Sequence, residues 1–195
     1  MYISQKTKGY SLVEVLVAIA ILLLALVGPM TIAAKGIQSA SYVREQTTAL
    51  YLAQEGIEAF TAMRNDAAIA ALGVNDKTKT WDWIDTGTIF SDCDNAGDGC
   101  NIDYENNNPA MSITKCGSNG AGCELYFDSS KARARYSLDN TSGVLTPYAR
   151  VIKMDKNSSG DGIKVKSTVF WETRLFGTTK QSVTLTTTLM DIYGN

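Results

Sequence analysis

The sequence predicts an α+β protein in which one long N-terminal helix packs on an antiparallel meander of strands. The first observation is a run without any charged side chain, residues 15–34, followed by a segment whose apolar residues recur at helical spacing. The second is a series of short alternating apolar runs from residue 124 onward, separated by segments rich in turn residues. We therefore expect a helical N-terminal part and a β-rich C-terminal part.

The N-terminal run is predicted to cross a membrane as a helix over residues 10–34. A helix rises about 1.5 Å per residue, so roughly 20 apolar residues cross the hydrocarbon core. Lys6 and Lys8 precede the run, which places the N-terminus in the cytoplasm and the chain after Lys35 on the outer face. A cleaved secretory signal is the alternative, although residues 33–35 would form only a poor cleavage site.

One carboxylate, Glu14, stands at the start of this apolar run. An ionised side chain costs at least about 2.5 kcal/mol near the centre of a bilayer, so Glu14 should have a partner or a function. The alternative is that Glu14 lies at headgroup depth and stays hydrated.

The residues around Glu14 form a specific pattern. It consists of Lys6-x-Lys8-Gly9, then Tyr10-Ser11-Leu12-Val13-Glu14, and the apolar run that follows directly. This pattern resembles the leader and cleavage site of type IV prepilins. The resemblance implies that residues 1–9 are a leader peptide, and that a prepilin peptidase cuts between Gly9 and Tyr10 and N-methylates the new amine of Tyr10. It further implies a pilin-like fold and packing into a helical filament with other pilin or pseudopilin subunits, driven by an inner-membrane assembly machinery.

Cleavage would create an ammonium group at Tyr10, four residues before Glu14. Two pairings are possible. Within one chain, positions 10 and 14 share a helix face and would pair modestly. Between chains, Glu14 of an assembled subunit would neutralise the Tyr10 amine of the incoming one. We favour the second pairing as a hypothesis, since a subunit docked one turn out of register would bury an unpaired charge at a cost of several kcal/mol.

The helix is expected to continue beyond the membrane span. Gly28 and Pro29 should kink it or break it locally, and in the pilin family a proline near this depth accompanies a bend or a melted turn in the filament. Residues 35–71 are predicted to be an amphipathic continuation. Its expected apolar stripe consists of Val43, Leu50 and Ile57, spaced by seven, together with Ala53, Phe60 and Ala67. The part from residue 49 to residue 65 looks like the equivalent region of minor pilins and of minor pseudopilins of type II secretion.

Residues 72–195 are predicted to form a globular head with cysteine-rich loops at residues 93–123. The pairs Cys93/Cys100 and Cys116/Cys123 each enclose the same pattern, C-x3-G-x-G-C. Zinc knuckles have tighter spacing, and cysteines outside the cytoplasm are oxidised, so we expect two disulfides. Pairing within each loop is the simplest solution because the glycines allow the chain to curl back, and the other two connectivities remain open.

The strands of the head are expected at residues 125–127, 133–138, 145–154, 163–171 and 182–190. Alternation is clearest in the last two, where Val169 and Trp171 share one face and Val183 and Leu185 share another. An antiparallel meander follows, whose apolar face covers the helix.

Composition narrows the function classes. Without Lys6 and Lys8, sixteen basic side chains remain against twenty acidic ones, which argues against general binding of nucleic acids. There is no histidine, which excludes histidine-based triads and common zinc sites, and the cysteines are assigned to disulfides, so no enzyme and no cofactor is expected. Two aspartate-rich loops, starting at Asp92 and Asp155, each lack a ligand of the EF-hand pattern, so no metal site is expected.

The leading interpretation is a minor pilin or pseudopilin, a structural subunit of a type IV pilus or a filament like that of type II secretion. The alternative is a filament-tip adhesin or a DNA-uptake receptor. For the latter, Lys131, Arg133 and Arg135 alternate on a predicted strand and would join Lys164 and Lys166 in a basic face.

Overall fold

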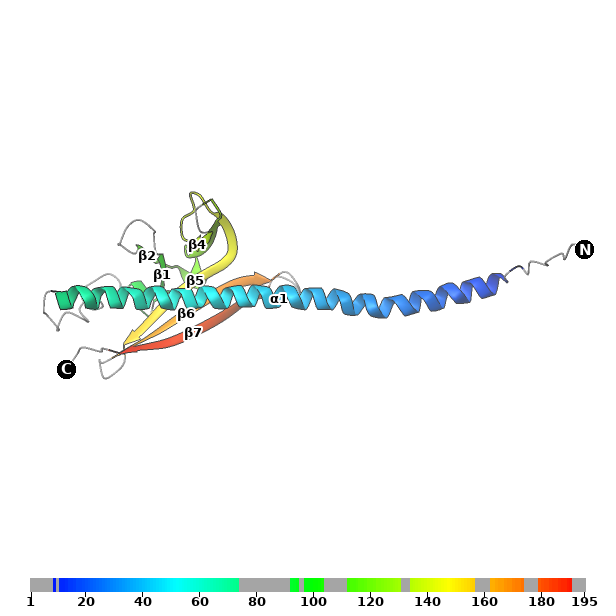
Figure 1. The fold of residues 1–195 in the computed structure, drawn as a ribbon, viewed down its shortest axis with the longest axis horizontal. Coiled ribbons are helices and arrows are strands. Elements are labelled where there is room, and N and C mark those ends of the chain that lie inside the picture. The colour runs from blue at the N-terminus through cyan, green and yellow to red at the C-terminus, as the bar shows by residue number, and fades with distance from the viewer. Residues whose placement is uncertain are drawn as a thin grey trace, which may run out of the picture. The chain divides into compact units, whose positions relative to one another are not determined.

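The protein is described here by a computed structural model, which covers residues 9, 11–73, 92–94, 97–103, 112–130, 134–156, 162–173 and 179–190 (Figure 1). One long N-terminal helix is followed by an antiparallel sheet of several strands, which confirms the predicted α+β fold. Contacts divide the chain into two units, residues 1–43 and residues 44–195, and each is described by itself.

Helix α1 comprises Leu12–Gly73. It begins where the apolar run begins, and it ends at a glycine, a residue that is unfavourable within a helix and common at its C-terminal end. Pro29 lies inside it, and the helix is assigned without interruption through this position. The bend or melted turn expected at Gly28 and Pro29 in an assembled filament stays a prediction.

The strands are β1 (Cys100–Asp103), β2 (Ser112–Lys115), β3 (Glu124–Asp128), β4 (Arg135–Ser137), β5 (Val144–Lys156), β6 (Gly162–Thr173) and β7 (Thr179–Met190), with a short 3-10 turn η2 (Ser118–Gly120) before β3. The sheet follows the order β2-β1-β5-β3-β4, and β6 lies between β5 and β7. All pairings between these strands are antiparallel. Strands β3 to β7 lie where the sequence predicts them, whereas β1 and β2 were not predicted.

Strand β7 pairs with β6 alone among the described strands, so it is an edge strand. All twelve of its residues pair in continuous register, from Thr179 opposite Thr173 to Met190 opposite Gly162. Its sole charged side chain is that of Lys180, and it has no proline.

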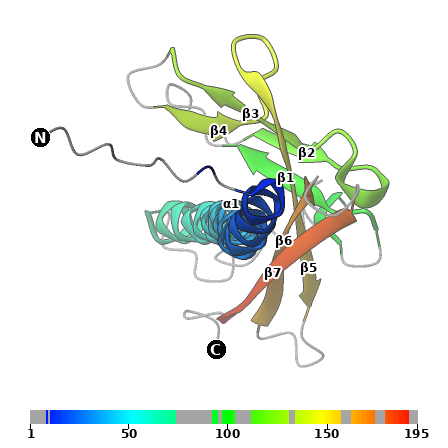
Figure 2. The same cartoon turned by 90° about the vertical axis from the view of Figure 1, so that its right-hand side faces the viewer.

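The main core lies between the sheet and the part of α1 that belongs to the second unit. Phe60 of the helix is fully buried and clusters with Ile102 of β1, Ile152 and Met154 of β5, and Val165 of β6. Figure 2 shows β1, β5, β6 and β7 on one side of α1. The helix therefore covers one face of the sheet.

The predicted contact stripe on the helix is wrong at two of its positions. Val43 and Leu50 are 54% and 40% exposed. The helix residues that are buried are Ala49, Leu52, Ala53, Gly56 and Phe60. Three of these residues, Ala49, Ala53 and Gly56, are small, and small residues let the helix backbone approach the sheet. A prediction based on large apolar residues does not detect them. Ala53 and Phe60 were correctly placed, and the side chain of Ala67 lies outside the described residues.

Gly56 marks the closest approach of helix and sheet. A Cβ atom on Gly56 would lie 2.7 Å from Ser167 Oγ, 3.0 Å from Arg150 Cδ and 3.3 Å from Ile152 Cδ1. Glycine within a helix costs about 1 kcal/mol relative to alanine, so helix propensity alone predicts that Gly56→Ala stabilises the protein. The packing at this position predicts the opposite.

Gly56→Ala is expected to lower the free energy of unfolding by about 1–3 kcal/mol, because an added methyl group forces the strands or Arg150 to shift. Ser167 Oγ is buried and has no hydrogen-bond partner among the described residues, so Ser167→Ala removes the nearest obstacle at little cost. Denaturant unfolding of both single variants and the double variant should show that Ser167→Ala relieves part of the loss. A stabilising effect of Gly56→Ala would contradict the close approach of the helix to β6 at this position.

The four cysteines form two disulfides, Cys93–Cys100 and Cys116–Cys123. The first belongs to the main core. The second holds a loop against the other face of the sheet, where it clusters with Val151 and Phe170. Gly120 in this loop has φ +83°, and a Cβ atom there would lie 3.2 Å from Ala149 Cβ, so only glycine fits without strain. The head thus has three layers: helix, sheet and disulfide-bonded loop.

Candidate functional site

The first candidate site is the start of α1, where the sequence places cleavage and assembly. The carbonyl oxygen of Ser11 accepts hydrogen bonds from the backbone N–H groups of Glu14 (3.0 Å) and Val15 (3.2 Å). Ser11 is therefore the residue that caps the helix, and Glu14 is in its first turn. Serine at the cap and glutamate three residues later is a combination that favours helix initiation, and a carboxylate there interacts favourably with the helix dipole.

Gly9 lies outside the helix and is exposed, with no heavy atom within 4 Å of the position of an added Cβ. On the N-terminal side of the predicted cleavage point, the backbone of Gly9 is therefore accessible from solvent. Tyr10 lies outside the described residues, so both pairings of its amine with Glu14, within one chain and the favoured one between chains, stay hypotheses.

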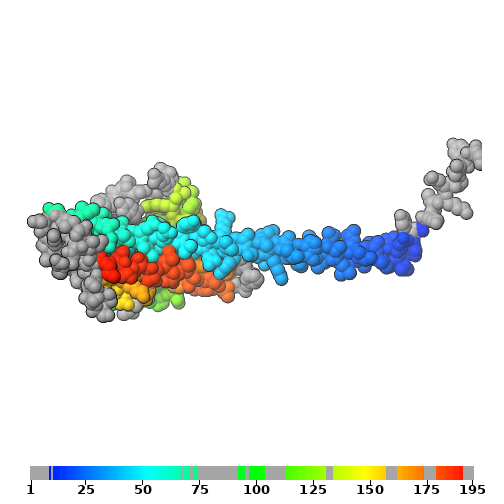
Figure 3. Space-filling model, turned by 60° about the horizontal axis from the view of Figure 1, so that its bottom comes forward, coloured from blue at the N-terminus to red at the C-terminus, as the bar shows by residue number. Residues whose placement is uncertain are grey.

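The apolar half of α1 has no cover. All side chains from residue 12 to residue 37 are exposed, and Figure 3 shows one face of this segment bare. It is the one helix in the described part of the chain that is long and apolar enough to cross a membrane. An apolar surface of this extent belongs in lipid or against other apolar helices.

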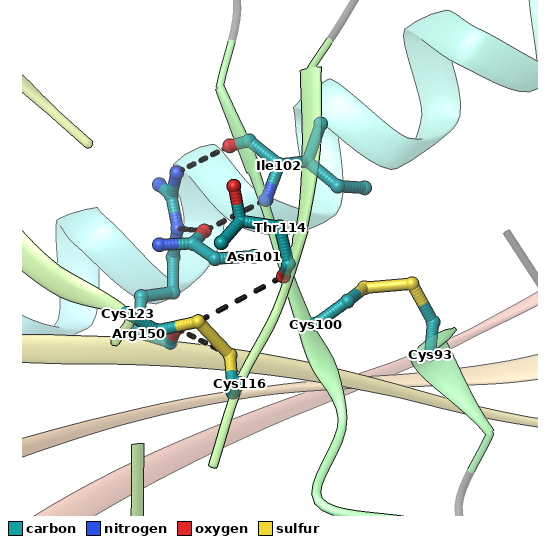
Figure 4. Close-up of a disulfide and its surroundings, with 8 residues drawn as sticks. All are labelled: Cys93, Cys100, Asn101, Ile102, Thr114, Cys116, Cys123 and Arg150. Carbon is teal, nitrogen blue, oxygen red and sulfur yellow. Dashed lines mark hydrogen bonds between the residues drawn. A yellow bond between two sulfur atoms is a disulfide. The ribbon is translucent and has the colours of Figure 1, made fainter. Parts of the chain in front are cut away.

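A second site, which the sequence did not indicate, lies between α1 and the sheet. Arg150 of β5 is only 3% exposed. Its Nε donates to Asn101 Oδ1 and its Nη2 to the carbonyl oxygen of Ile102, both at 2.8 Å (Figure 4). Its Nη1 donates to the carbonyl oxygen of Leu52 (3.3 Å) and forms an ion pair with Glu55 Oε2 (3.4 Å). One guanidinium group thus links α1, β1 and β5.

Burial favours the neutral form of both side chains, Glu55 and Arg150, and shifts their pKa values accordingly. It raises the pKa of the Glu55 carboxyl, and the charge of Arg150 opposes this rise. It lowers the pKa of the Arg150 guanidinium, and the carboxylates of Glu55 and Asp103 oppose that change. Asn101 Nδ2 is buried without a hydrogen-bond partner among the described residues, and Glu55 and Arg150 line a small cavity of about 300 Å³. Because the contacts of Arg150 join the helix to two strands, we interpret the network as structural.

The raised pKa of Glu55 predicts a pH effect. The folded protein holds the Glu55 proton more tightly than the unfolded chain, so this contribution to stability is complete below the unfolded pKa and is lost as the pH rises through the folded pKa. Between about pH 4 and about pH 7, wild type should therefore lose stability relative to Glu55→Gln. The slope should be small because the carboxylate is half exposed.

Free energies of unfolding at several pH values check this expectation. Glu58→Gln, an exposed position on the same helix, controls for the loss of one charge. A difference between wild type and Glu55→Gln that grows in favour of wild type as the pH rises would contradict it.

The acidic residues of the cysteine-rich loops do not converge. Asp98 accepts a hydrogen bond from Ser118 Oγ (3.4 Å), and Asp103 accepts one from the backbone N–H of Leu138 (2.9 Å). Within the described ranges, no three acidic or cysteine side chains form a group suited to a metal ion. Most of the second aspartate loop, residues 157–161, lies outside the described residues.

Among the described basic residues proposed for a DNA-binding face, Arg135 lies apart from Lys164 and Lys166. Arg135 lies opposite Asp128 in the β3–β4 pair, and the neighbouring Phe127 lies opposite Val144 at the start of β5. Lys164 lies opposite Asp155, near the other end of β5. Lys131 and Arg133 lie outside the described residues.

Comparison with known proteins yields one match, and it covers the segment of the first candidate site. Residues 4–28 match the family model of the prokaryotic N-terminal methylation motif, which is the type IV pilin-like prepilin signature. No curated protein and no solved structure matches the chain. The match includes Gly9, Tyr10 and Glu14, and it ends at Gly28.

Proposed function

Because residues 4–28 are a type IV prepilin signature, we propose that this protein is a structural subunit, a minor pilin or pseudopilin, of a type IV pilus or a filament like that of type II secretion. One observation supports this most directly. An uncovered apolar helix starts three residues after an exposed Gly9 and bears a single carboxylate in its first turn.

The proposed maturation begins in the membrane. Lys6 and Lys8 keep the N-terminus in the cytoplasm, where a prepilin peptidase cleaves after Gly9 and N-methylates Tyr10. The apolar half of α1 then anchors the mature subunit as a single span, with the head outside the cytoplasm.

Assembly exchanges lipid for protein around this helix. The inner-membrane assembly machinery extracts the subunit, and contacts with lipid are replaced by contacts with the apolar helices of other subunits. Hydrophobic burial changes little in this exchange, so packing and charge pairing must supply the specificity. Glu14 is the one acid in the apolar part of α1, and we assign it to the Tyr10 amine of the neighbouring subunit.

Coexpression with a prepilin peptidase tests this proposal. We expect N-terminal sequencing and mass measurement to find a mature chain that starts at Tyr10 and is one methyl group heavier than the unmodified peptide. Gly9→Leu should keep residues 1–9 under the same conditions. A chain that retains its leader in the presence of active peptidase, with a known prepilin cleaved in parallel, would contradict the proposal.

A further inference from the structure

The sequence predicts an apolar stripe on α1, and the folded head leaves much of it uncovered. Val43 and Leu50 are 54% and 40% exposed, and Ile57 is half-buried. The sheet packs instead on the neighbouring face of the helix, which carries Gly56 and Phe60. In Figure 3, part of α1 within the head (cyan) lies at the surface. The core of the head therefore does not account for this stripe.

The uncovered side of the helix has a regular composition. Side chains three and four residues apart share one face of a helix. Steps of four and three residues from Leu50 and Ile57 therefore add three uncharged polar residues, Thr47, Gln54 and Thr61. We call these five residues the helix seam. The charged residues within residues 44–61 all lie outside the seam: Arg44, Glu45, Glu55 and Glu58.

A helix side without charge is not typical of a surface that faces only water. The solvent-facing side of an amphipathic helix normally bears charged residues. Alternating steps of three and four residues are the spacing with which one helix packs into the grooves of another. The hydroxyl and amide groups of the seam suit hydrogen bonds to a protein partner, which lipid tails do not offer. The seam therefore fits a second helix.

We propose that the helix seam binds the N-terminal helix of a neighbouring subunit in the filament. This inference rests on the proposed function and deepens it, since it extends the contacts between subunits from the apolar part of α1 into the head. Both parts belong to one helix, which is assigned without interruption from Leu12 to Gly73. Helices that cross at about 20° remain in contact over several turns, so the contacts of two packed helices need not end with the apolar part.

One position of the seam, Thr47, allows a charge to be added at the surface of the head. Thr47 is exposed, so Thr47→Lys and Thr47→Ala should unfold at nearly the same denaturant concentration as wild type. The residues one helical turn away include no acid that would pair with an added lysine: Val43, Arg44, Leu50 and Tyr51. A lysine at this position therefore meets a docked helix as an unpaired charge.

Incorporation into the filament measures the effect of this charge. In cells that assemble the filament, the ratio of sheared filament to membrane form should be at least about ten-fold lower for Thr47→Lys than for wild type, because an unpaired charge would be buried between helices. Thr47→Ala is the matched control, which adds no charge and should be incorporated as wild type is. N-terminal sequencing should show that both variants are still cleaved after Gly9.

A photo-reactive benzophenone side chain in place of Leu50 identifies the occupant. After irradiation of sheared filaments, mass spectrometry should find it joined to a peptide from the N-terminal helix of another subunit. The same group in place of Thr184 is the control. Thr184 is exposed and lies opposite Thr168 on the sheet face that carries the disulfide-bonded loop, away from α1, so it should yield few such products.

The outcomes separate this proposal from the proposed function. Equal incorporation of Thr47→Lys and Thr47→Ala would overturn the helix seam, and so would crosslinks from position 50 that reach only strands of another subunit or only lipid. In each of these cases wild type still enters the filament, so the proposed function stands. A mature wild-type chain that is absent from every filament contradicts the proposed function, and this inference with it.

Discussion

Replacement of Glu14 by alanine is expected to leave membrane insertion intact and to abolish incorporation of the chain into a filament. The segment that inserts becomes more apolar, so the anchor remains. In the filament, however, the Tyr10 amine of the next subunit would be buried without a counter-charge. An unpaired charge in an apolar interior costs at least about 2.5 kcal/mol, which corresponds to a loss of about sixty-fold in the assembly equilibrium per subunit.

The amount of Glu14→Ala protein is measured in the membrane fraction and in the sheared filament fraction of cells that assemble the filament. Glu58→Ala, an exposed acid on the same helix, is the matched control and should be incorporated as wild type is. N-terminal sequencing of the membrane form shows that Glu14→Ala is still cleaved. Normal incorporation of Glu14→Ala would contradict the role assigned to this carboxylate.

Arg150→Met is expected to lower the free energy of unfolding of the head by about 3–5 kcal/mol. Methionine fills much of the same volume but donates no hydrogen bond. The carbonyl oxygens of Leu52 and Ile102 would then lose the donor that Arg150 supplies in the interior, and Asn101 Oδ1 would keep the N–H of Ile102 as its donor. Arg150→Lys should restore little of the lost stability. One ammonium group does not reproduce the planar guanidinium group, which from β5 reaches both α1 and β1.

Denaturant unfolding followed by tryptophan fluorescence measures this loss. Lys164→Met, an exposed position on the neighbouring strand β6, is the control and should change stability by less than about 0.5 kcal/mol. An Arg150→Met protein within about 1 kcal/mol of wild type would show that the network contributes little to joining helix and sheet.

The sequence predicts those features of this protein that are local in the chain. The predicted cleavage point and the carboxylate of Glu14 lie within residues 9–14, and strands β5 to β7 are long enough for alternation to stand out. Strands β1 and β2 have four residues each and lie within a polar cysteine-rich region, so they produce no periodic signal.

The contacts of Arg150 are not local. Its partners are 48 to 98 residues away in sequence, and only the tertiary fold brings them together. The sequence nevertheless contains one indication that Arg150 is buried. In β5, the buried face consists of Tyr148, Arg150, Ile152 and Met154, so period-two alternation places the arginine inward, between an aromatic and an aliphatic residue. An arginine at such a position indicates a buried ion pair or hydrogen-bond network.

The regular edge formed by β7 makes the isolated head prone to associate with copies of itself. Natural sheets protect long edges with prolines, bulges or inward-pointing charges, and across its twelve paired residues β7 offers only one lysine. Heads that are overproduced without an anchor would meet edge to edge at high concentration and join into amyloid-like aggregates. A head that is anchored in a membrane would have fewer ways to bring this edge against a second one.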